Sequence, residues 1–302
     1  MLHDSVEVDG RTRTYTVTGG PSANLVLVFH GSKQTGPVHR DFTGRIFDTV
    51  PAVVVYLDGY RRNWNDARRE SRFPARIENV DDVAFTRAVI AKLVVSHGVD
   101  PAKVFAVGYS NGGQMVMRLA HEQPALLAGA TVIAATLPEA ESFLLAGAAP
   151  VPLPVLLIHG TKDPIVRYQG GGMSWFTRAV FKVGGRSLSM PETAAYFAAR
   201  NGITATPVSA RVPAAAAVPA ATAKPGATST AIAGPPAAKA RTWVERTEYR
   251  QAGRPPVALY TVHGGGHTIP GPRRAPAAFV VGETNSDVNT AELVTEFFGL
   301  AR

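Results

Sequence analysis

The chain of 302 residues contains no cysteine. This absence excludes a disulfide framework, a thiolate metal site, an iron–sulfur cluster and a cysteine nucleophile, because each of them needs the sulfur of that residue. Any chemistry must therefore use oxygen and nitrogen groups. The sequence also has no run of about eighteen apolar residues, so it predicts no segment that spans a bilayer.

Acidic residues are the scarcer charged type, with 23 Asp and Glu against 31 Lys and Arg, for a net charge of +8. Such a charge can attract nucleic acid, but the chain has no nucleic-acid motif and no stripe of alternating basic and aromatic residues. We therefore expect no nucleic-acid partner. The composition, 45% hydrophobic and 18% charged, is typical of a globular protein with a substantial core and excludes disorder of the whole chain.

The N-terminal residues 1–15 lack the apolar central segment of a secretory signal peptide and carry Asp4, Glu7 and Asp9. Together with the absence of cysteine, this favours a cytoplasmic location. An extracellular or periplasmic location is the alternative if a signal has been removed.

Short apolar runs without alternation recur along the chain and are typical of strands buried on both faces, as in a parallel sheet. Helical patterns at 80–97, 112–122 and 287–300 lie among them, and alternation over 5–17 around Asp9-Gly10 predicts an N-terminal antiparallel hairpin. The sequence thus predicts an α/β fold in which residues 1–302 form one domain. We expect a mostly parallel central sheet with helices on both faces and ligands at the carboxyl ends of the strands. The predicted buried strands are 25–29, 53–57, 104–107, 132–135, 155–158 and 257–262.

Residues 204–240 interrupt this pattern because they consist almost entirely of Ala, Pro, Thr, Ser, Gly and Val. Repeated prolines remove backbone donors, and small side chains bury too little apolar area to offset the entropy of ordering them. We expect a low-complexity insertion that acts as a surface tether without regular structure. The strand pattern resumes at 243–250.

The strongest motif is the run Val-Phe-Ala-Val-Gly-Tyr-Ser-Asn-Gly-Gly at 104–113, an apolar strand followed by Gly-x-Ser-x-Gly and a helical pattern. This order is that of a nucleophile elbow, in which small residues allow a sharp turn that lifts the Ser110 hydroxyl above the sheet at a helix N-terminus. The alternative is an ordinary glycine-rich turn between a strand and a helix.

A nucleophilic serine needs a base and an orienting acid, which follow it in the chain order Ser, Asp or Glu, His in this type of fold. Asp163 lies in the loop after the strand at 155–158 and is the candidate acid, unless it belongs to a plain Asp-Pro turn. Two histidines follow the strand at 257–262. We favour His267, which three glycines separate from the strand, and expect His263 at the strand end to be structural.

An oxyanion hole would combine the backbone N–H of Asn111 with that of Ser32, in the loop after the first central strand. His30 in the same loop is expected to pack within it and not to react.

Together these residues resemble the polyhydroxybutyrate depolymerase-like and feruloyl esterase-like branch of the α/β-hydrolase superfamily. The resemblance implies a serine esterase that forms an acyl-enzyme with Ser110, Asp163 and His267, and that needs no cofactor or metal. Its substrates would be soluble short-chain, aryl or oligomeric hydroxyalkanoate esters. Secreted members often have cysteines where this chain has Ser32 and Asn63. The motifs that carry the resemblance are His30-Gly31, Trp64-Asn65, residues 80–85, residues 108–113, His159-Gly160 with Asp163 and Val166, and residues 264–271.

Candidate substrate-binding residues are Trp64, Asn65, Tyr109 and Trp175. Trp64 and Asn65 follow a strand and either line the rim of the site or pack in the interior. Trp175 belongs to an apolar group, with Met173, Phe176 and Phe181, that forms either a substrate pocket or a small satellite core. The stretch 61–76 holds six arginines against Asp66 and Glu70 and so supplies +4 of the net charge. It either attracts carboxylate-bearing esters or is a solvated surface without a role.

Two other functions use the same residues. A serine peptidase or amidase would keep the triad, whereas a non-catalytic α/β-hydrolase-like binding protein usually lacks one of its members. The sequence leaves the acyl and alcohol specificity and the oligomeric state open.

Overall fold

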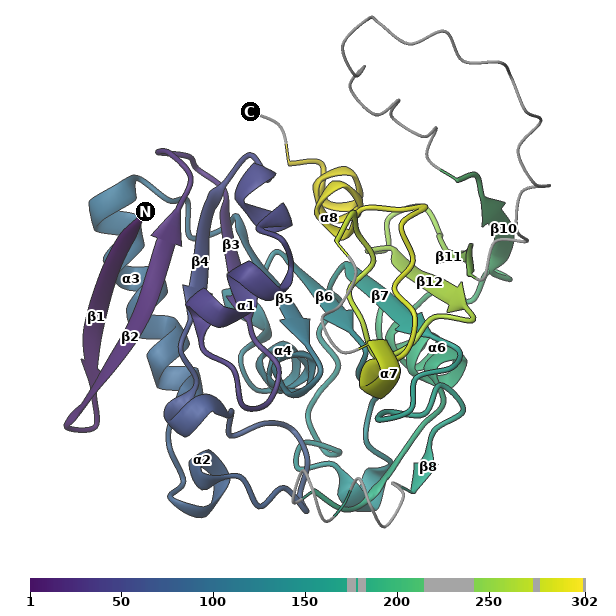
Figure 1. The fold of residues 1–302 in the computed structure, drawn as a ribbon, viewed down its shortest axis with the longest axis horizontal. Coiled ribbons are helices and arrows are strands. Elements are labelled where there is room, and N and C mark those ends of the chain that lie inside the picture. The colour runs from purple at the N-terminus through teal and green to yellow at the C-terminus, as the bar shows by residue number, and fades with distance from the viewer. Residues whose placement is uncertain (173–177, 179–182, 215–241, 274–277, 301–302) are drawn as a thin grey trace, which may run out of the picture.

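The protein is organised around one ten-stranded sheet, as Figure 1 shows for a computed structural model. The structure describes residues 1–172, 178, 183–214, 242–273 and 278–300. The strand order is β1-β2-β4-β3-β5-β6-β7-β12-β11-β10. The strands are β1 (Leu2–Val8), β2 (Arg11–Thr18), β3 (Leu25–Phe29), β4 (Val53–Leu57), β5 (Val104–Tyr109), β6 (Gly129–Ile133), β7 (Val155–Gly160), β10 (Val208–Val212), β11 (Trp243–Tyr249) and β12 (Val257–His263).

The centre of the sheet is parallel, from β4 through β3, β5, β6 and β7 to β12. Every residue of β3, β4, β5, β6 and β7 is buried, which is why these segments read as continuous apolar runs. β1, β2, β10 and β11 add antiparallel pairs at the two edges. The predicted mostly parallel α/β fold is therefore confirmed.

The N-terminal hairpin of β1 and β2 is confirmed as well. Its turn is formed by Asp9 and Gly10, both with positive φ (49° and 70°), as a two-residue type I′ turn requires.

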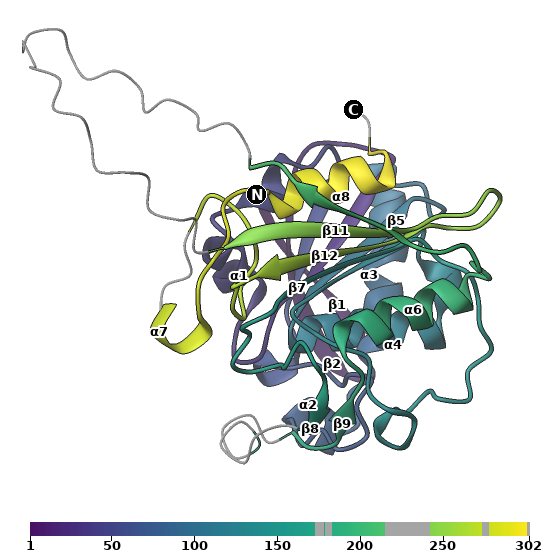
Figure 2. The same ribbon diagram turned by 90° about the vertical axis from the view of Figure 1, so that its right-hand side faces the viewer.

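Helices cover both faces of the sheet. α3 (Asp82–His97), α4 (Asn111–Glu122) and α6 (Met190–Arg200) pack with the larger apolar cluster, whereas α1 (Gly36–Phe42) and α8 (Thr290–Phe298) pack with the smaller one. Figure 2 shows α8 and α6 on opposite sides of β7, β11 and β12. No helix in the described ranges is long and apolar enough to cross a membrane. The short elements are α2 (Pro74–Ile77), β8 (Gly171–Gly172), β9 (Arg186–Ser187) and α7 (Ala278–Val281).

The expectation of no regular structure across 204–240 is wrong for Val208–Val212, which forms β10 at the edge of the sheet and pairs with β11. Pro207 and Pro213 flank this strand, so all five of its residues keep a backbone N–H for the ladder. Residues 215–241 of the insertion lie outside the described residues. The strand expected at 132–135 ends earlier, at Ile133, because Ala134 turns the chain with φ of 52°.

The parallel strands deliver Ser110, Asp163 and His267 to one edge. β5 ends immediately before Ser110, β7 ends three residues before Asp163, and β12 ends four residues before His267. Since β5, β6, β7 and β12 run parallel as neighbours, their carboxyl ends lie together.

Candidate active site

The turn at Ser110 has the strained backbone of a nucleophile elbow. Ser110 adopts φ 55° and ψ −115°, a conformation that side-chain-bearing residues seldom occupy, and its N–H donates to the Ile133 carbonyl at 2.8 Å. The two glycines that flank this turn cannot be replaced by larger residues, because a side chain there would collide with neighbouring backbone. A Cβ on Gly108 would lie 2.2 Å from the Gly112 oxygen, and one on Gly112 would lie 2.1 Å from the Phe29 oxygen. The small residues therefore permit the sharp turn between β5 and α4.

Three side chains from separate segments form one hydrogen-bonded chain. The distance from His267 Nε2 to Ser110 Oγ is 2.9 Å, and that from His267 Nδ1 to Asp163 Oδ2 is 2.6 Å. His267 is 4% exposed and Asp163 is 6% exposed, so little water competes for these contacts. The structure thus brings together the serine, histidine and carboxylate that the sequence proposed, in the arrangement of a catalytic triad.

Asp163 is held as a carboxylate by several donors. Its Oδ1 accepts from the backbone N–H groups of Ile165 and Val166, each at 2.8 Å, and His159 Nε2 lies 3.2 Å from its Oδ2. Burial by itself would raise the pKa of Asp163. The imidazoles of His267 and His159 outweigh burial and hold that pKa well below its ordinary value of 3.8. The acid is therefore ionised throughout the range in which His267 could act as a base.

The loop before His267 is fixed by its backbone. The His267 N–H donates to the Val281 carbonyl at 2.6 Å, and the Tyr109 hydroxyl donates to the His267 carbonyl at 2.7 Å. A Cβ on Gly266 would lie 2.0 Å from the Val281 oxygen, so this glycine is required by close backbone packing and not by flexibility.

The two predicted oxyanion segments pack against each other. Asn111 is the first residue of α4, where backbone N–H groups have no partner within the helix. A Cβ on Gly112 would lie 2.7 Å from the His30 oxygen, so the loop that carries Ser32 runs beside the elbow. Neither the Asn111 nor the Ser32 N–H has an acceptor among the residues that the structure describes. Their use as oxyanion donors stays a prediction.

Comparison with known proteins agrees with this geometry. NocK of Nocardia uniformis subsp. tsuyamanensis, which is named an esterase, is 32% identical over 305 residues, covering 97% of this chain and 80% of NocK. The chain belongs to the esterase branch of the α/β-hydrolase superfamily. The family model described as "Phospholipase/Carboxylesterase" matches residues 43–179. Feruloyl esterase B of Piromyces equi is 31% identical over 122 residues, which cover 40% of this chain and 22% of that protein.

A solved structure supports the fold of this esterase along its full length. Acetyl xylan esterase from Aspergillus awamori superposes with a TM-score of 0.59 and 15% sequence identity, and the alignment covers 100% of both chains. At this identity the similarity concerns the fold alone.

Trp64 and Asn65 do not line the rim of the site, and that prediction is wrong. They are 0% and 1% exposed, so a substrate cannot reach them. Trp64 instead joins the two candidate oxyanion segments, because its Nε1 donates to the His30 carbonyl at 2.9 Å and its backbone N–H donates to Asn111 Oδ1 at 3.0 Å. The Asn65 side chain donates to the Val80 carbonyl at 2.9 Å. Trp64 therefore supports the site from the interior, whereas Asn65 is bonded to the start of the segment that leads into α3.

Tyr109 is also misassigned as a substrate-binding residue. It is 6% exposed, and its hydroxyl is engaged with the His267 carbonyl. Burial, together with the charge of Asp163, raises the pKa of Tyr109 well above 10, so the hydroxyl remains a donor. Trp175, the last of the predicted substrate-binding residues, lies outside the described residues, as do Met173, Phe176 and Phe181.

His263 and His30 have the structural roles that the sequence predicted. His263 stacks on Trp243 with ring centroids 3.7 Å apart and lies 3.2 Å from a Glu245 oxygen. Burial lowers the pKa of His30 to about 4, so its ring is neutral near pH 7. His30 Nδ1 then donates to the Gly31 carbonyl, while Nε2 accepts from the Gly59 N–H.

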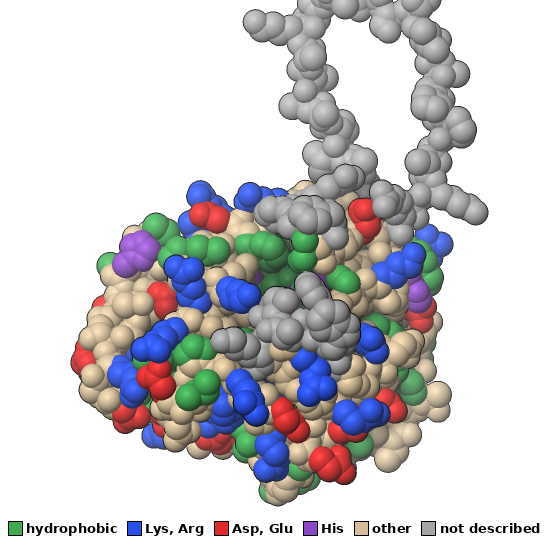
Figure 3. All heavy atoms as spheres, turned by 60° about the horizontal axis from the view of Figure 1, so that its bottom comes forward, with side chains coloured by type: hydrophobic (Ala, Val, Ile, Leu, Met, Phe, Trp, Pro, Cys, Tyr) green, Lys and Arg blue, Asp and Glu red, His purple; other side chains and the backbone are tan. Residues whose placement is uncertain are grey.

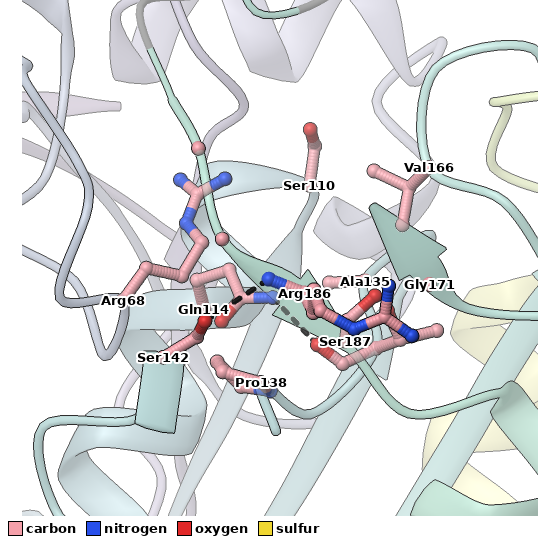
Figure 4. Close-up of a pocket in the computed structure, with 13 residues that line it drawn as sticks. Arg68, Ser110, Gln114, Ala135, Pro138, Ser142, Val166, Gly171, Arg186 and Ser187 are labelled. Carbon is pink, nitrogen blue, oxygen red and sulfur yellow. Dashed lines mark hydrogen bonds between the residues drawn. The ribbon is translucent and has the colours of Figure 1, made fainter. Parts of the chain in front are cut away.

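A pocket opens beside Ser110, as Figure 4 shows. Within the described ranges, no group of three or more His, Asp or Glu side chains is arranged as a set of metal ligands. The pocket is lined by Arg68, Ser110, Gln114, Ala135, Thr136, Pro138, Ser142, Val166, Gly171, Gly184, Gly185, Arg186 and Ser187.

Sequence reasoning missed three residues that shape the site. His159 was noted only within a motif, yet its Nε2 contacts the Asp163 carboxylate. Asp66 was counted as a surface charge, but it is fully buried and its Oδ2 accepts from Asn111 Nδ2 at 2.5 Å. Asp81 and Asp82 stand together at the start of α3, where either carboxylate could cap the helix. Asp81 does cap it, whereas Asp82 forms a buried ion pair with Arg13 at 2.6 Å.

The depressed pKa of Asp163 predicts a stability effect. A carboxyl whose pKa is lower in the folded than in the unfolded state stabilises the fold at pH values above the unfolded pKa, and this contribution is lost as the pH falls through the folded value. We expect the difference in unfolding free energy between wild type and Asp163→Asn to be largest above about pH 4 and to shrink below it. Urea unfolding of both proteins from pH 7 to pH 3 measures this. A difference that grows toward acid pH would contradict it.

Proposed function

We propose that this esterase is a serine carboxylic ester hydrolase, in which Ser110 is the nucleophile, His267 the general base and Asp163 the orienting acid. The observation that carries the proposal is the hydrogen-bonded chain from Ser110 Oγ through His267 to Asp163, with both links shorter than 3 Å. Ser110 also lines a pocket, through which a substrate could reach the hydroxyl.

In the first half of the reaction, Ser110 Oγ attacks the ester carbonyl carbon while His267 Nε2 takes the hydroxyl proton. Asp163 accepts a hydrogen bond from His267 Nδ1 and stabilises the imidazolium. The proton then passes from Nε2 to the leaving alkoxy oxygen, and the alcohol departs. The acyl group remains on Ser110 as an ester.

In the second half, water replaces the alcohol. His267 Nε2 removes a proton from the water as its oxygen attacks the acyl carbon, and the same proton returns to Ser110 Oγ as the carboxylic acid leaves. The backbone N–H groups of Asn111 and Ser32 would donate to the negatively charged carbonyl oxygen in both halves. The N-terminal end of α4 adds its partial positive charge at Asn111.

Cleavage of peptides or amides by the same triad is the alternative. It differs in the leaving group, since a poor amine leaving group needs protonation by His267 before the bond breaks. The family comparisons concern esterases and favour the ester.

We expect the kcat/KM for an aryl ester to be at least about a thousandfold higher than that for the matched aryl amide. The estimate corresponds to the loss of one interaction that stabilises the transition state. Assay of the two substrates side by side measures this ratio. A panel of 4-nitrophenyl esters of increasing acyl length, a feruloyl ester and soluble hydroxybutyrate oligomers then defines the substrate. Faster turnover of the amide would assign a peptidase, and no turnover of any member would favour a non-catalytic binding protein.

A further inference from the structure

Arg68 holds a fixed guanidinium group in the wall of the pocket that contains Ser110. Its Nε lies 3.2 Å from Asp66 Oδ1, and its Nη2 donates to Asp66 Oδ2. Asp66 has no exposed surface, and Asn111 Nδ2 also donates to it. The Arg68 guanidinium lies 5.7 Å from the centre of the Phe73 ring. Arg68 is therefore held in one orientation before any ligand arrives.

One edge of this guanidinium remains available. Within the described residues, Nη1 has no hydrogen-bond partner, and it is not among the fully buried atoms that lack one. The side chain keeps 11% of its surface exposed. Figure 4 shows the guanidinium of Arg68 and the hydroxyl of Ser110 at the same opening. Nη1 and the second hydrogen of Nη2 form the end of the planar fork, which can bind a carboxylate through two parallel hydrogen bonds.

The charge near this edge favours an anion. Arg76 Nη2 donates to the backbone carbonyls of Asp66 and Arg68, so a second guanidinium group lies beside the segment that carries the Asp66–Arg68 pair. On the opposite wall Arg186 pairs with Glu139 at 3.0 Å, and these two charges balance. Glu70 Oε1 accepts a hydrogen bond at 3.1 Å from the hydroxyl of Ser142, which lines the pocket, and its other carboxylate oxygen is fully buried. No carboxylate lines the pocket within the described ranges.

Arg68 is distinct from the other arginines of the stretch 61–76. It alone lines the pocket among these six, whereas Arg61 pairs with Glu78 at 3.0 Å and Arg69 donates to the Glu141 carbonyl. Figure 3 shows Lys and Arg mixed with Asp and Glu on the face seen at the bottom of Figure 1, so the visible part of this face carries no field of one sign. Arg68 is therefore a better candidate for binding an anion by direct contact than the whole stretch is for steering one.

We propose that Arg68 is a substrate-binding residue that receives a free carboxylate of the substrate, so that the preferred class is an ester carrying a second, ionised carboxyl group. This proposal rests on the proposed serine esterase function. Such substrates include monoesters of dicarboxylic acids, with the carboxylate on the acyl side, and acyl esters of hydroxy acids, with the carboxylate on the alcohol side. The carboxylate would bind Nη1 and Nη2 while the ester carbonyl lies at Ser110.

The test compares matched pairs of esters by pH-stat. On the acyl side, monoethyl succinate, glutarate and adipate are compared with ethyl butanoate, pentanoate and hexanoate; on the alcohol side, carboxyl-terminated butyrate esters are compared with neutral alkyl butyrates. We expect the wild type to prefer the carboxylate member of at least one pair. Arg68→Met should lower the ratio of kcat/KM between the carboxylate and the neutral ester roughly ten- to hundredfold, because this is the typical contribution of hydrogen bonds to a charged group. A purely structural role of Arg68 would lower both members equally and leave their ratio unchanged.

Arg72→Met is the matched control, because Arg72 is an exposed arginine of the same stretch that does not line the pocket. It should leave the preference intact, and an equal loss in this variant would assign the preference to the general field and overturn the role of Arg68. No preference in any pair of the wild type would overturn it as well. Ser110→Ala separates the two proposals. If this variant still hydrolyses the esters, the serine mechanism fails; if it is inactive while Arg68→Met keeps the preference, only the assignment of Arg68 fails.

Discussion

Ser110→Ala is expected to lower kcat/KM for an aryl ester by about 10⁴-fold or more, because the members of a serine triad act as a unit and none replaces the nucleophile. The fold should be retained. The hydroxyl contacts His267 Nε2 and is not needed to cap α4, since no side-chain capping bond forms there. The measurements are steady-state kinetics and the melting temperature. Mass spectrometry after reaction with a serine-directed phosphonate should locate the label on Ser110 alone.

The control for this labelling is Ser96→Ala. Ser96 is an exposed serine in the last turn of α3 whose hydroxyl donates to the Lys92 carbonyl and makes no contact with the triad. This variant should keep both activity and labelling. Labelling of another serine in the wild type, or full activity of Ser110→Ala, would remove Ser110 from the mechanism.

The parts of the fold that could be predicted are those where a local pattern determines the structure. Strands buried on both faces appear as continuous apolar runs, and the elbow appears as glycines at the two positions where a Cβ would meet backbone within 2.2 Å. The order of Ser110, Asp163 and His267 could be placed because each follows a recognisable strand. Parallel strands then bring their carboxyl ends to one edge without further information.

The environments of individual polar and aromatic residues could not be predicted, because they depend on contacts between distant segments. A tryptophan that follows a strand can lie either at the rim of an active site or in the interior of the protein. Trp64 is interior because His30 and Asn111, which lie on two other segments, accept its N–H groups. In the sequence, Asp66 is one charged residue within an arginine-rich stretch, which is typical of a protein surface. Only its burial beside Asn111 and Arg68 shows that it supports the site.

The edge strand β10 shows a further reason for failure. A segment rich in alanine and proline has little apolar area, and its five strand residues are mostly exposed. Their order comes from backbone pairing with β11, which no side-chain periodicity reveals.

His267→Ala should match Ser110→Ala in severity, whereas His263→Ala should keep most of the activity. His267 alone joins Ser110 to Asp163, so its loss removes the base and leaves the nucleophile unactivated, with an expected fall in kcat of about 10⁴-fold or more. His263 is bound to Trp243 and Glu245 on the neighbouring strand β11, away from this chain of hydrogen bonds. Losing its stacking should cost about 0.5–1.5 kcal/mol of stability. Kinetics and urea unfolding of both variants separate the two effects, and a greater loss of kcat in His263→Ala would reverse the assignment of the base.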